Sequence, residues 1–164
     1  MKKLLLFLTL STIFVNAQSF KIVSGGFVNS EDVNKNFVVF DFPNKTKSEL
    51  FTAVKKYLQT EISDVRAFSF TDDEQIVVHY TDKGAIRRAD YNYKDIYAFK
   101  DGKIKYEPSL NFERSTIYQN DTNPHVISAD LKNKKTNEAL ENYLNTKVIL
   151  IKQGIQKELT DNNF

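Results

Sequence analysis

The side chains best suited to general acid–base chemistry in this sequence are those of Asp41 and His79. Each lies in a short stretch rich in β-branched and aromatic residues, so both are expected on strands, with their side chains on the same sheet face. On neighbouring strands, such a pair could serve a secreted hydrolase, because aspartate orients imidazole and holds its pKa near the operating pH. No motif places a nucleophile beside them, so an unrelated His and Asp on one face remain the simpler interpretation.

A polar stretch around His125 is the second place where ligand-type side chains gather, with Asp121 and Asn123 at alternating positions before it. An EF-hand calcium loop requires glycine at its sixth position, which is Val126 when counted from Asp121. The sequence also lacks a glycine-rich phosphate loop, a G-x-S-x-G serine and an H-E-x-x-H zinc motif. We therefore expect no catalytic residues, no metal site and no cofactor.

The element that carries Asp41 is expected to be a strand over 37–42, which is followed by Pro43-Asn44 and a helix. Thr46 and Glu49 are three residues apart and form a capping-box pattern at the helix start. Apolar residues then recur at spacings of three and four up to Leu58, which predicts an amphipathic helix that ends near 60–62.

The element that carries His79 is expected to be a strand over 75–81, paired through Asp72-Asp73-Glu74 with a strand over 65–71. A second hairpin joins 91–100 to 103–107 through Asp101-Gly102, for which a type I′ turn is predicted. Pro108 is expected to interrupt or end the return strand, with Leu110 and Phe112 as its continuation in the alternative. Period-two alternation places Val38, Phe40, Ile76 and Val78 on a face covered by the helix. The tyrosines of 91–97 share a parity with Phe99, and we favour a core position for them over an exposed aromatic strip. The opposite face is expected to be open, and it carries the candidate ligand-binding residues Phe37, Val39, Val77 and His79.

A last helix is predicted over 136–160, where Leu140, Leu144, Val148, Ile151, Ile155 and Leu159 recur every three or four residues. Gly154 falls inside this run and predicts a kink or an early end, because glycine costs about 1 kcal/mol relative to alanine in a helix. The element order β-α-β-β-β-β-α describes an α+β domain, a curved antiparallel sheet with its helices on one face.

The N-terminus has the pattern of a cleavable secretory signal over 1–17: Lys2 and Lys3, an apolar run, and Val15-Asn16-Ala17 before Gln18. Loss of both lysines leaves 21 basic and 21 acidic residues in the mature chain. This neutral balance gives no reason to expect a nucleic-acid partner. The chain has no cysteine, which excludes disulfides and the cysteine that anchors a bacterial lipoprotein. The mature chain is therefore expected in the periplasm, at the cell surface or outside the cell, without a membrane anchor.

The mature chain divides into a flexible segment over 18–35, an α+β core over 36–114, a polar loop over 115–133 and a helical region over 134–164. The stretch from Phe37 to Arg114 resembles a bacterial domain-of-unknown-function family with a TATA-binding-protein-like (TBP-like) fold. The resemblance rests on the strand over 37–42 running into Pro43-Asn44-Lys45-Thr46, on Tyr57 late in the helix, and on the Lys100–Lys103 hairpin. It implies a curved antiparallel sheet with helices on one side, and it implies neither DNA binding nor any catalytic residue.

The function expected from these features is that of an exported, non-enzymatic binding domain or cell-envelope accessory domain. Its partner would be an envelope protein, a peptide or a glycan, contacted by the open sheet face. Two alternatives remain at this point. One is the secreted hydrolase with Asp41 and His79, and the other is a self-associating structural protein that uses the apolar stripe of the last helix as its dimer seam.

Overall fold

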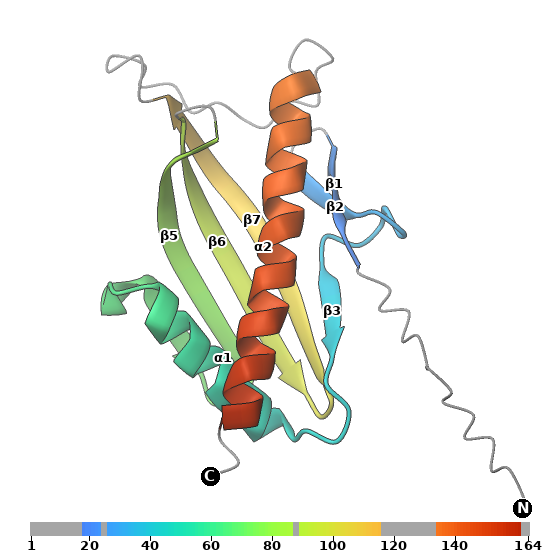
Figure 1. Ribbon diagram of the computed structural model, residues 1–164, viewed down its shortest axis with the longest axis vertical. Helices are drawn as coiled ribbons and strands as arrows, with labels where there is room; N and C mark the ends of the chain where they lie inside the picture. The colour runs from blue at the N-terminus through green and yellow to red at the C-terminus, as the bar shows by residue number, and fades with distance from the viewer. Residues whose placement is uncertain (1–17, 24–25, 87–88, 116–133, 162–164) are drawn as a thin grey trace, which may run out of the picture.

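A five-stranded antiparallel sheet with two helices on one face forms the body of the protein, as the computed structural model shows (Figure 1). The structure describes residues 18–23, 26–86, 89–115 and 134–161. The strand order is β3-β7-β6-β5-β4. The strands of this sheet are β3 (Val38–Asp41), β4 (Phe68–Thr71), β5 (Gln75–Ile86), β6 (Ala89–Lys100) and β7 (Lys103–Ser115), and the helices are α1 (Lys47–Glu61) and α2 (Lys134–Asp161). The predicted α+β fold with helices on one face is confirmed.

The helix α1 begins where the sequence predicts. Thr46 is its N-cap: its hydroxyl accepts a hydrogen bond from the Glu49 backbone N–H at 3.3 Å, and the Glu49 carboxylate accepts one from the Thr46 backbone N–H at 2.8 Å. The Asp101 carboxylate accepts a further hydrogen bond from the Lys47 backbone N–H at 2.7 Å. Backbone donors at the start of a helix have no partner inside it, so these side chains fix where α1 starts.

The hairpin of β6 and β7 turns at Asp101-Gly102, with Lys100 paired to Lys103. Of these two turn residues, only Gly102 has a positive φ, of 72°. The predicted type I′ turn needs a positive φ at both positions, so this prediction is wrong. Pro108 does not interrupt or end the strand, because β7 continues to Ser115, and the expected continuation through Leu110 and Phe112 is the part of the prediction that holds. In the described residues, the pairing of β3 with β7 stops at Val38 and Tyr106. Pro108 lies beyond this pairing, so its missing backbone N–H leaves no hydrogen bond to β3 unmade.

The segment over 18–35 contains an ordered β-hairpin of β1 (Phe20–Val23) and β2 (Gly26–Asn29), so the prediction of a flexible segment is wrong. Phe20 and Phe27 are buried in the core. The Asn145 side chain on α2 accepts a hydrogen bond from the Phe20 N–H at 2.7 Å and donates one to the Phe20 carbonyl at 3.0 Å. This contact spans most of the chain length, which is why local sequence patterns did not reveal it.

The core lies between the sheet and the two helices. It includes the residues that alternate inward from β6, among them Tyr91, Tyr93, Tyr97 and Phe99, so the predicted core position of these tyrosines is confirmed. The whole apolar stripe of α2 is buried in the same core. The stripe is therefore not free to act as the predicted dimer seam.

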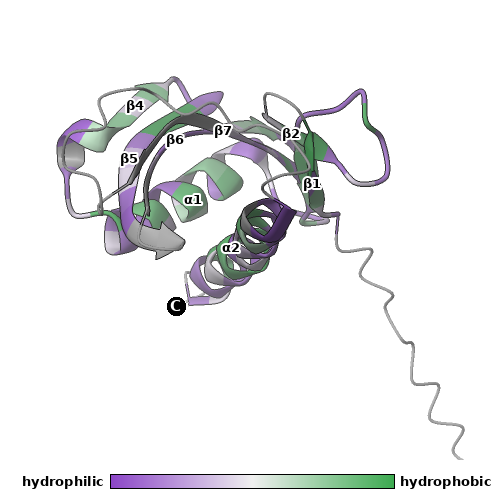
Figure 2. Cartoon of the chain, turned by 90° about the horizontal axis from the view of Figure 1, so that it is seen from above, coloured by the Kyte–Doolittle hydropathy of each residue, from purple (hydrophilic) through white to green (hydrophobic). Residues whose placement is uncertain are grey.

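The sheet curves around the helices, which lie inside the curve (Figure 2). α1 and α2 pack against each other as well as against the sheet. No described element covers the outer face of the sheet, where β3, β7, β6 and β5 carry a mixture of lysines, acidic residues and small apolar side chains. The two faces are therefore chemically different: aromatic and buried on the inside, and charged and partly exposed on the outside.

Candidate functional site

Asp41 and His79, the predicted acid–base pair, lie on β3 and β5. These strands are not neighbours, because β7 and β6 lie between them. Adjacent strands are about 4.8 Å apart, so the two residues are separated by roughly 14 Å across the sheet. Asp41 forms an ion pair with Lys103 at 3.5 Å instead. The arrangement does not support the predicted hydrolase pair, and the cause is a strand order that places the long hairpin of β6 and β7 between the two segments.

The predicted ligand-binding residues of the open face fall into two groups. Phe37 precedes β3 and Val39 lies on it, whereas Val77 and His79 lie on β5, with two strands in between. The Lys105 ammonium, on the intervening β7, lies 4.7 Å from the centre of the Phe37 ring. His79 is exposed, and the three apolar residues are partly buried. These side chains therefore share a face without forming one continuous apolar patch.

His125 and Asp121 lie outside the described residues. Within the described ranges, no group of three or more His, Cys, Asp or Glu side chains is placed to hold a metal ion.

No helix in the ranges that the structure describes is long and apolar enough to cross a membrane.

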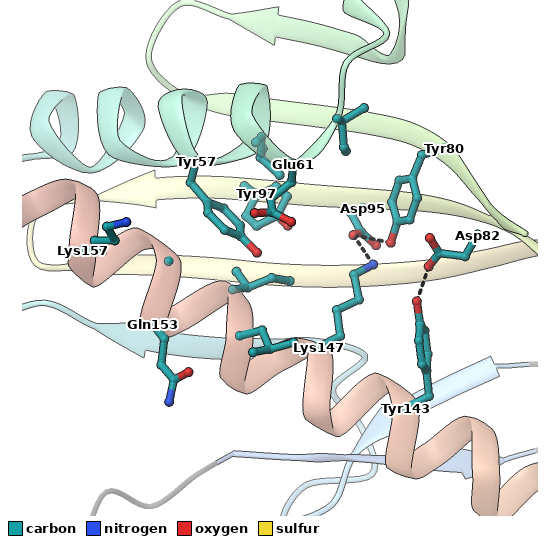
Figure 3. Close-up of a pocket in the computed structure, with 15 residues that line it drawn as sticks. Tyr57, Glu61, Tyr80, Asp82, Asp95, Tyr97, Tyr143, Lys147, Gln153 and Lys157 are labelled. Atoms are coloured by element: carbon teal, nitrogen blue, oxygen red, sulfur yellow. Dashed lines mark hydrogen bonds and ion pairs between the residues drawn. The ribbon is translucent and has the colours of Figure 1, made fainter. Parts of the chain in front are cut away.

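A cleft of about 510 Å³ opens on the helix side of the sheet, between the C-terminal half of α1 and the middle of α2 (Figure 3). Its floor is formed by β5 and β6. Tyrosine, leucine and isoleucine side chains line much of it. Charged side chains come from every element around it: Glu61 from α1, Asp82 from β5, Asp95 from β6, and Lys147 and Lys157 from α2. A concave, mostly apolar site with a few convergent polar groups is the usual form of a ligand pocket.

Asp95 is the central polar residue of this cleft. It is only 1% exposed and lies among the tyrosines that alternate inward from β6. Its Oδ2 atom accepts hydrogen bonds from the Tyr80 hydroxyl at 3.0 Å and from the Lys147 ammonium at 2.8 Å. Its Oδ1 atom is buried and has no hydrogen bond of normal geometry to a described residue, although the Tyr106 hydroxyl lies close to the carboxylate. A buried carboxylate oxygen without a partner is costly, so this atom is the best candidate in the cleft for contact with a ligand.

Lys147 extends from α2 across the cleft to Asp95 (Figure 3). Its ammonium lies 4.3 Å from the centre of the Tyr80 ring and 4.5 Å from that of Tyr93, within the range of cation–π attraction. Burial lowers the pKa of Lys147 to about 7. Burial also raises the pKa of Asp95 well above its usual value, although the nearby Tyr106 hydroxyl opposes part of this rise. Both charges are thus poorly solvated and depend on each other.

Tyrosine hydroxyls surround the pair. The Tyr143 hydroxyl donates a hydrogen bond to Asp82 at the side of the cleft (Figure 3). Burial raises the pKa of Tyr57 to about 12, and it raises the pKa of Tyr143 as well. The hydroxyls of Tyr93 and Tyr106 are buried and have no hydrogen-bond partner in the described structure. These phenols remain protonated at neutral pH, so they can donate hydrogen bonds without adding charge.

The sequence analysis did not identify this site, although a signal was present. Along the inward side of β6, Asp95 interrupts an otherwise aromatic alternation of Tyr91, Tyr93, Tyr97 and Phe99. Lys147 lies next to Leu144 and Val148, on the border of the apolar stripe of α2. A charged residue at a core position usually has a buried partner of opposite charge, which would have pointed from Asp95 to a lysine on the helix that covers it.

The arrangement of sheet and helices can be compared with solved structures. A TBP-like protein from Parabacteroides distasonis ATCC 8503 superposes with a TM-score of 0.52 and 12% sequence identity, covering 76% of this chain and 90% of its own. A DUF4468 family protein from Bacteroides ovatus ATCC 8483 superposes with a TM-score of 0.51 and 12% identity, covering 88% of this chain and 91% of its own. The chain has a TBP-like fold. The fold that the sequence resemblance implied is confirmed.

At 12% identity, the TBP-like fold is what the comparison establishes, and the chemistry of the cleft must be argued from this chain's own residues. No protein-family model and no curated protein matches the chain.

Proposed function

We propose that the protein is an exported, non-enzymatic binding domain of the bacterial cell envelope, and that its ligand occupies the cleft between α1 and α2. The observation that carries the proposal is Asp95, a carboxylate buried on the cleft floor. One of its oxygens is held by Lys147 and Tyr80, and the other has no hydrogen bond of normal geometry within the described structure. Export is supported by the order of charged, apolar and small residues over 1–17.

Binding fits the cleft better than catalysis does. Asp95 and Lys147 have the side chains of an acid and a base, but each is held by the other at 2.8 Å. Burial lowers the pKa of Lys147, but the ion pair with Asp95 and the two tyrosine rings favour its charged form. A nucleophilic lysine needs to be neutral. The side chains are therefore arranged for recognition of a polar group within an aromatic site.

Binding in the cleft can be tested by recording amide NMR spectra of the mature chain during titration with a fragment library and with the small-molecule fraction of a cell-envelope extract. We expect the shifted amides to cluster in α1, α2 and β5 around the cleft. Leu150→Trp should abolish the shifts, because Leu150 is exposed and lines the cleft. Gln156→Trp is the matched control: Gln156 is exposed on the same helix and is not among the cleft residues. Shifts that survive Leu150→Trp would contradict the proposed site.

Export is tested by expressing the full chain in a bacterium and sequencing the N-terminus of the protein found outside the cytoplasm. The expected N-terminus is Gln18. A variant with Lys2 and Lys3 both changed to Glu should accumulate as uncleaved precursor, since the positive start of a signal is needed for its orientation. Uncleaved wild-type protein retained in the cytoplasm would contradict the localisation.

The outer sheet face is a second candidate contact surface, for a protein, peptide or glycan partner. Val77 on β5 is paired with Ile96 on β6, which gives this part of the face a small apolar centre between charged residues. Capture from an envelope extract by the mature chain would distinguish the surfaces. Loss of a partner with Val77→Asp assigns that partner to the outer face, and loss with Leu150→Trp assigns it to the cleft.

A further inference from the structure

The inner end of the cleft has the composition of a cage for a positively charged amine. The Asp95 carboxylate lies 2.8 Å from the Lys147 Nζ atom, and the rings of Tyr80 and Tyr93 lie within 4.5 Å of the same atom. The two rings are stacked on each other, with their centres 5.3 Å apart. A carboxylate beside aromatic faces is a common way for proteins to hold an ammonium group.

The cage has hydrogen-bonding capacity that Lys147 does not use. The Oδ1 atom of Asp95 is a buried acceptor without a hydrogen bond of normal geometry, although the Tyr106 hydroxyl lies close to the carboxylate. The buried hydroxyl of Tyr93, on the ring beside the ammonium, also has no described partner. An ammonium group carries three N–H donors, so one that enters more deeply than Lys147 does could contact more of these atoms.

The charges around the cleft also favour a cation. Asp95 and Lys147 neutralise each other, which leaves the carboxylates of Glu61 and Asp82 against the single ammonium of Lys157. Glu61 is the last residue of α1, and the C-terminal end of a helix carries a partial negative charge. The field at this part of the surface is therefore negative.

Lys147 belongs to α2, which forms a wall of the cleft, whereas Asp95, Tyr80 and Tyr93 belong to the strands of its floor. The Lys147 side chain is 18% exposed, and a long flexible stem carries its ammonium. Turning the stem outward would return the ammonium to water without moving α2. A group that takes its place would keep the Asp95 charge compensated.

We propose that the cage of Asp95, Tyr80 and Tyr93 is an alkylammonium-binding site, which Lys147 fills from within the chain until an alkylammonium group of the ligand replaces it. This inference rests on the cleft being the binding site. The ligand class is a primary alkylamine, supplied either as a free small molecule or as the side chain of a lysine in a peptide.

The test uses the mature chain with Lys147→Ala, which removes the internal occupant and retains its Cβ atom. The probe is n-propylammonium chloride, which has the carbon chain and ammonium that the substitution deletes. We expect it to raise the melting temperature of the variant by several degrees in a saturable manner, because a ligand that binds only the folded state stabilises that state. The controls are n-propanol, which lacks the charge, and sodium chloride at matched ionic strength.

Two further variants assign the effect to the cage. In Lys147→Ala combined with Asp95→Asn, the advantage of n-propylammonium over n-propanol should disappear. In Lys147→Met, the side chain fills the space, and little stabilisation is expected. If Lys147→Ala does not fold alone, recovery of its circular dichroism signal on refolding with each compound provides the same comparison.

Equal effects of amine and alcohol, or no effect of either, would overturn the proposal. In the wild-type protein, n-propylammonium and a blocked lysine amide are titrated by amide NMR. Shifts near Tyr80 with both probes support a site for any alkylammonium, and shifts with the lysine amide alone assign it to peptides. Fragments that bind the cleft while amines do not stabilise Lys147→Ala would retain the proposed binding site and overturn only the ligand class.

Discussion

The ring of Tyr57 on α1 lies directly against the backbone of Gly154 on α2. A Cβ atom added at Gly154 would be 2.2 Å from Cε2 of that ring, well inside any normal van der Waals separation. The glycine therefore allows the two helices to approach each other, and both residues line the cleft. The early end that the sequence predicted at Gly154 does not occur, because α2 continues to Asp161, and the predicted kink is absent from its straight ribbon (Figure 1).

We expect Gly154→Ala to destabilise the protein, although alanine is the better helix former. Alanine gains about 1 kcal/mol over glycine in helix propensity. Forcing its methyl group into a filled space costs about 2 kcal/mol if the Tyr57 ring moves only partly, which is the middle of the typical range of about 1–3 kcal/mol. The net expectation is a loss of about 1 kcal/mol in the free energy of unfolding, measured by urea denaturation.

Removing the ring should reverse the sign of that effect. In a Tyr57→Ala background, Gly154→Ala has no ring to displace and should stabilise the protein by about 1 kcal/mol through helix propensity alone. The double-mutant cycle isolates the contact between the two residues. If Gly154→Ala is equally destabilising in both backgrounds, the ring is not the reason for the glycine.

Replacing Lys147 with Met should make stability depend more strongly on pH. Burial raises the pKa of Asp95, and the nearby carboxylate of Asp82 raises it further. Without the ammonium, the folded state keeps a proton on Asp95 at pH values above about 4, where the unfolded chain has lost it. The folded state then binds more protons, so stability is greatest below the unfolded pKa and falls as pH rises toward the folded pKa.

The measurement is urea unfolding of both proteins between pH 4 and 8. The variant should lose stability relative to wild type as pH rises, by at most about 1.4 kcal/mol per pH unit. The total loss should approach the ~3–5 kcal/mol typical of a broken buried ion pair. Asp95→Asn combined with Lys147→Met has no carboxyl to titrate and should show no such slope. A constant difference between Lys147→Met and wild type would contradict the role of the ion pair.

Local patterns in the sequence predicted much of the fold because the responsible interactions are local. The capping box of Thr46 and Glu49, the Asp101-Gly102 hairpin and the stripe of α2 each depend on residues a few positions apart. The faces of the strands followed from alternation in the same way.

The cleft was not predicted because it depends on contacts between distant segments. Asp95 and Lys147 are 52 positions apart, and Tyr143 and Asp82 are 61 apart. Local periodicity carries no information about which strand lies beside which. For the same reason, the sequence suggested Asp41 and His79 as a pair, although β7 and β6 lie between their strands.

Thr46→Ala tests the best-predicted local feature. The substitution removes the hydroxyl that accepts a hydrogen bond from the Glu49 N–H, and loss of an N-cap typically costs about 1 kcal/mol. Thr46→Ser keeps the hydroxyl and should remain near wild type. Equal stability of all three proteins would show that the carboxylates of Asp101 and Glu49 are sufficient to cap α1.

Val77 and Val78 are consecutive residues on opposite faces of β5, and they provide a matched test of which face is open. Val78 is fully buried beneath the helices, whereas Val77 is partly buried on the outer face. Val78→Asp places an unpaired charge in the core and should cost more than about 4 kcal/mol, enough to unfold much of the protein. Val77→Asp leaves its carboxylate in contact with water, so we expect a loss of about 1 kcal/mol or less, mainly from lower strand propensity. Thermal melting of the two variants gives the comparison directly. If Val77→Asp were as disruptive as Val78→Asp, the outer face would be covered in the folded protein, and the cleft between α1 and α2 would be left as the accessible binding surface.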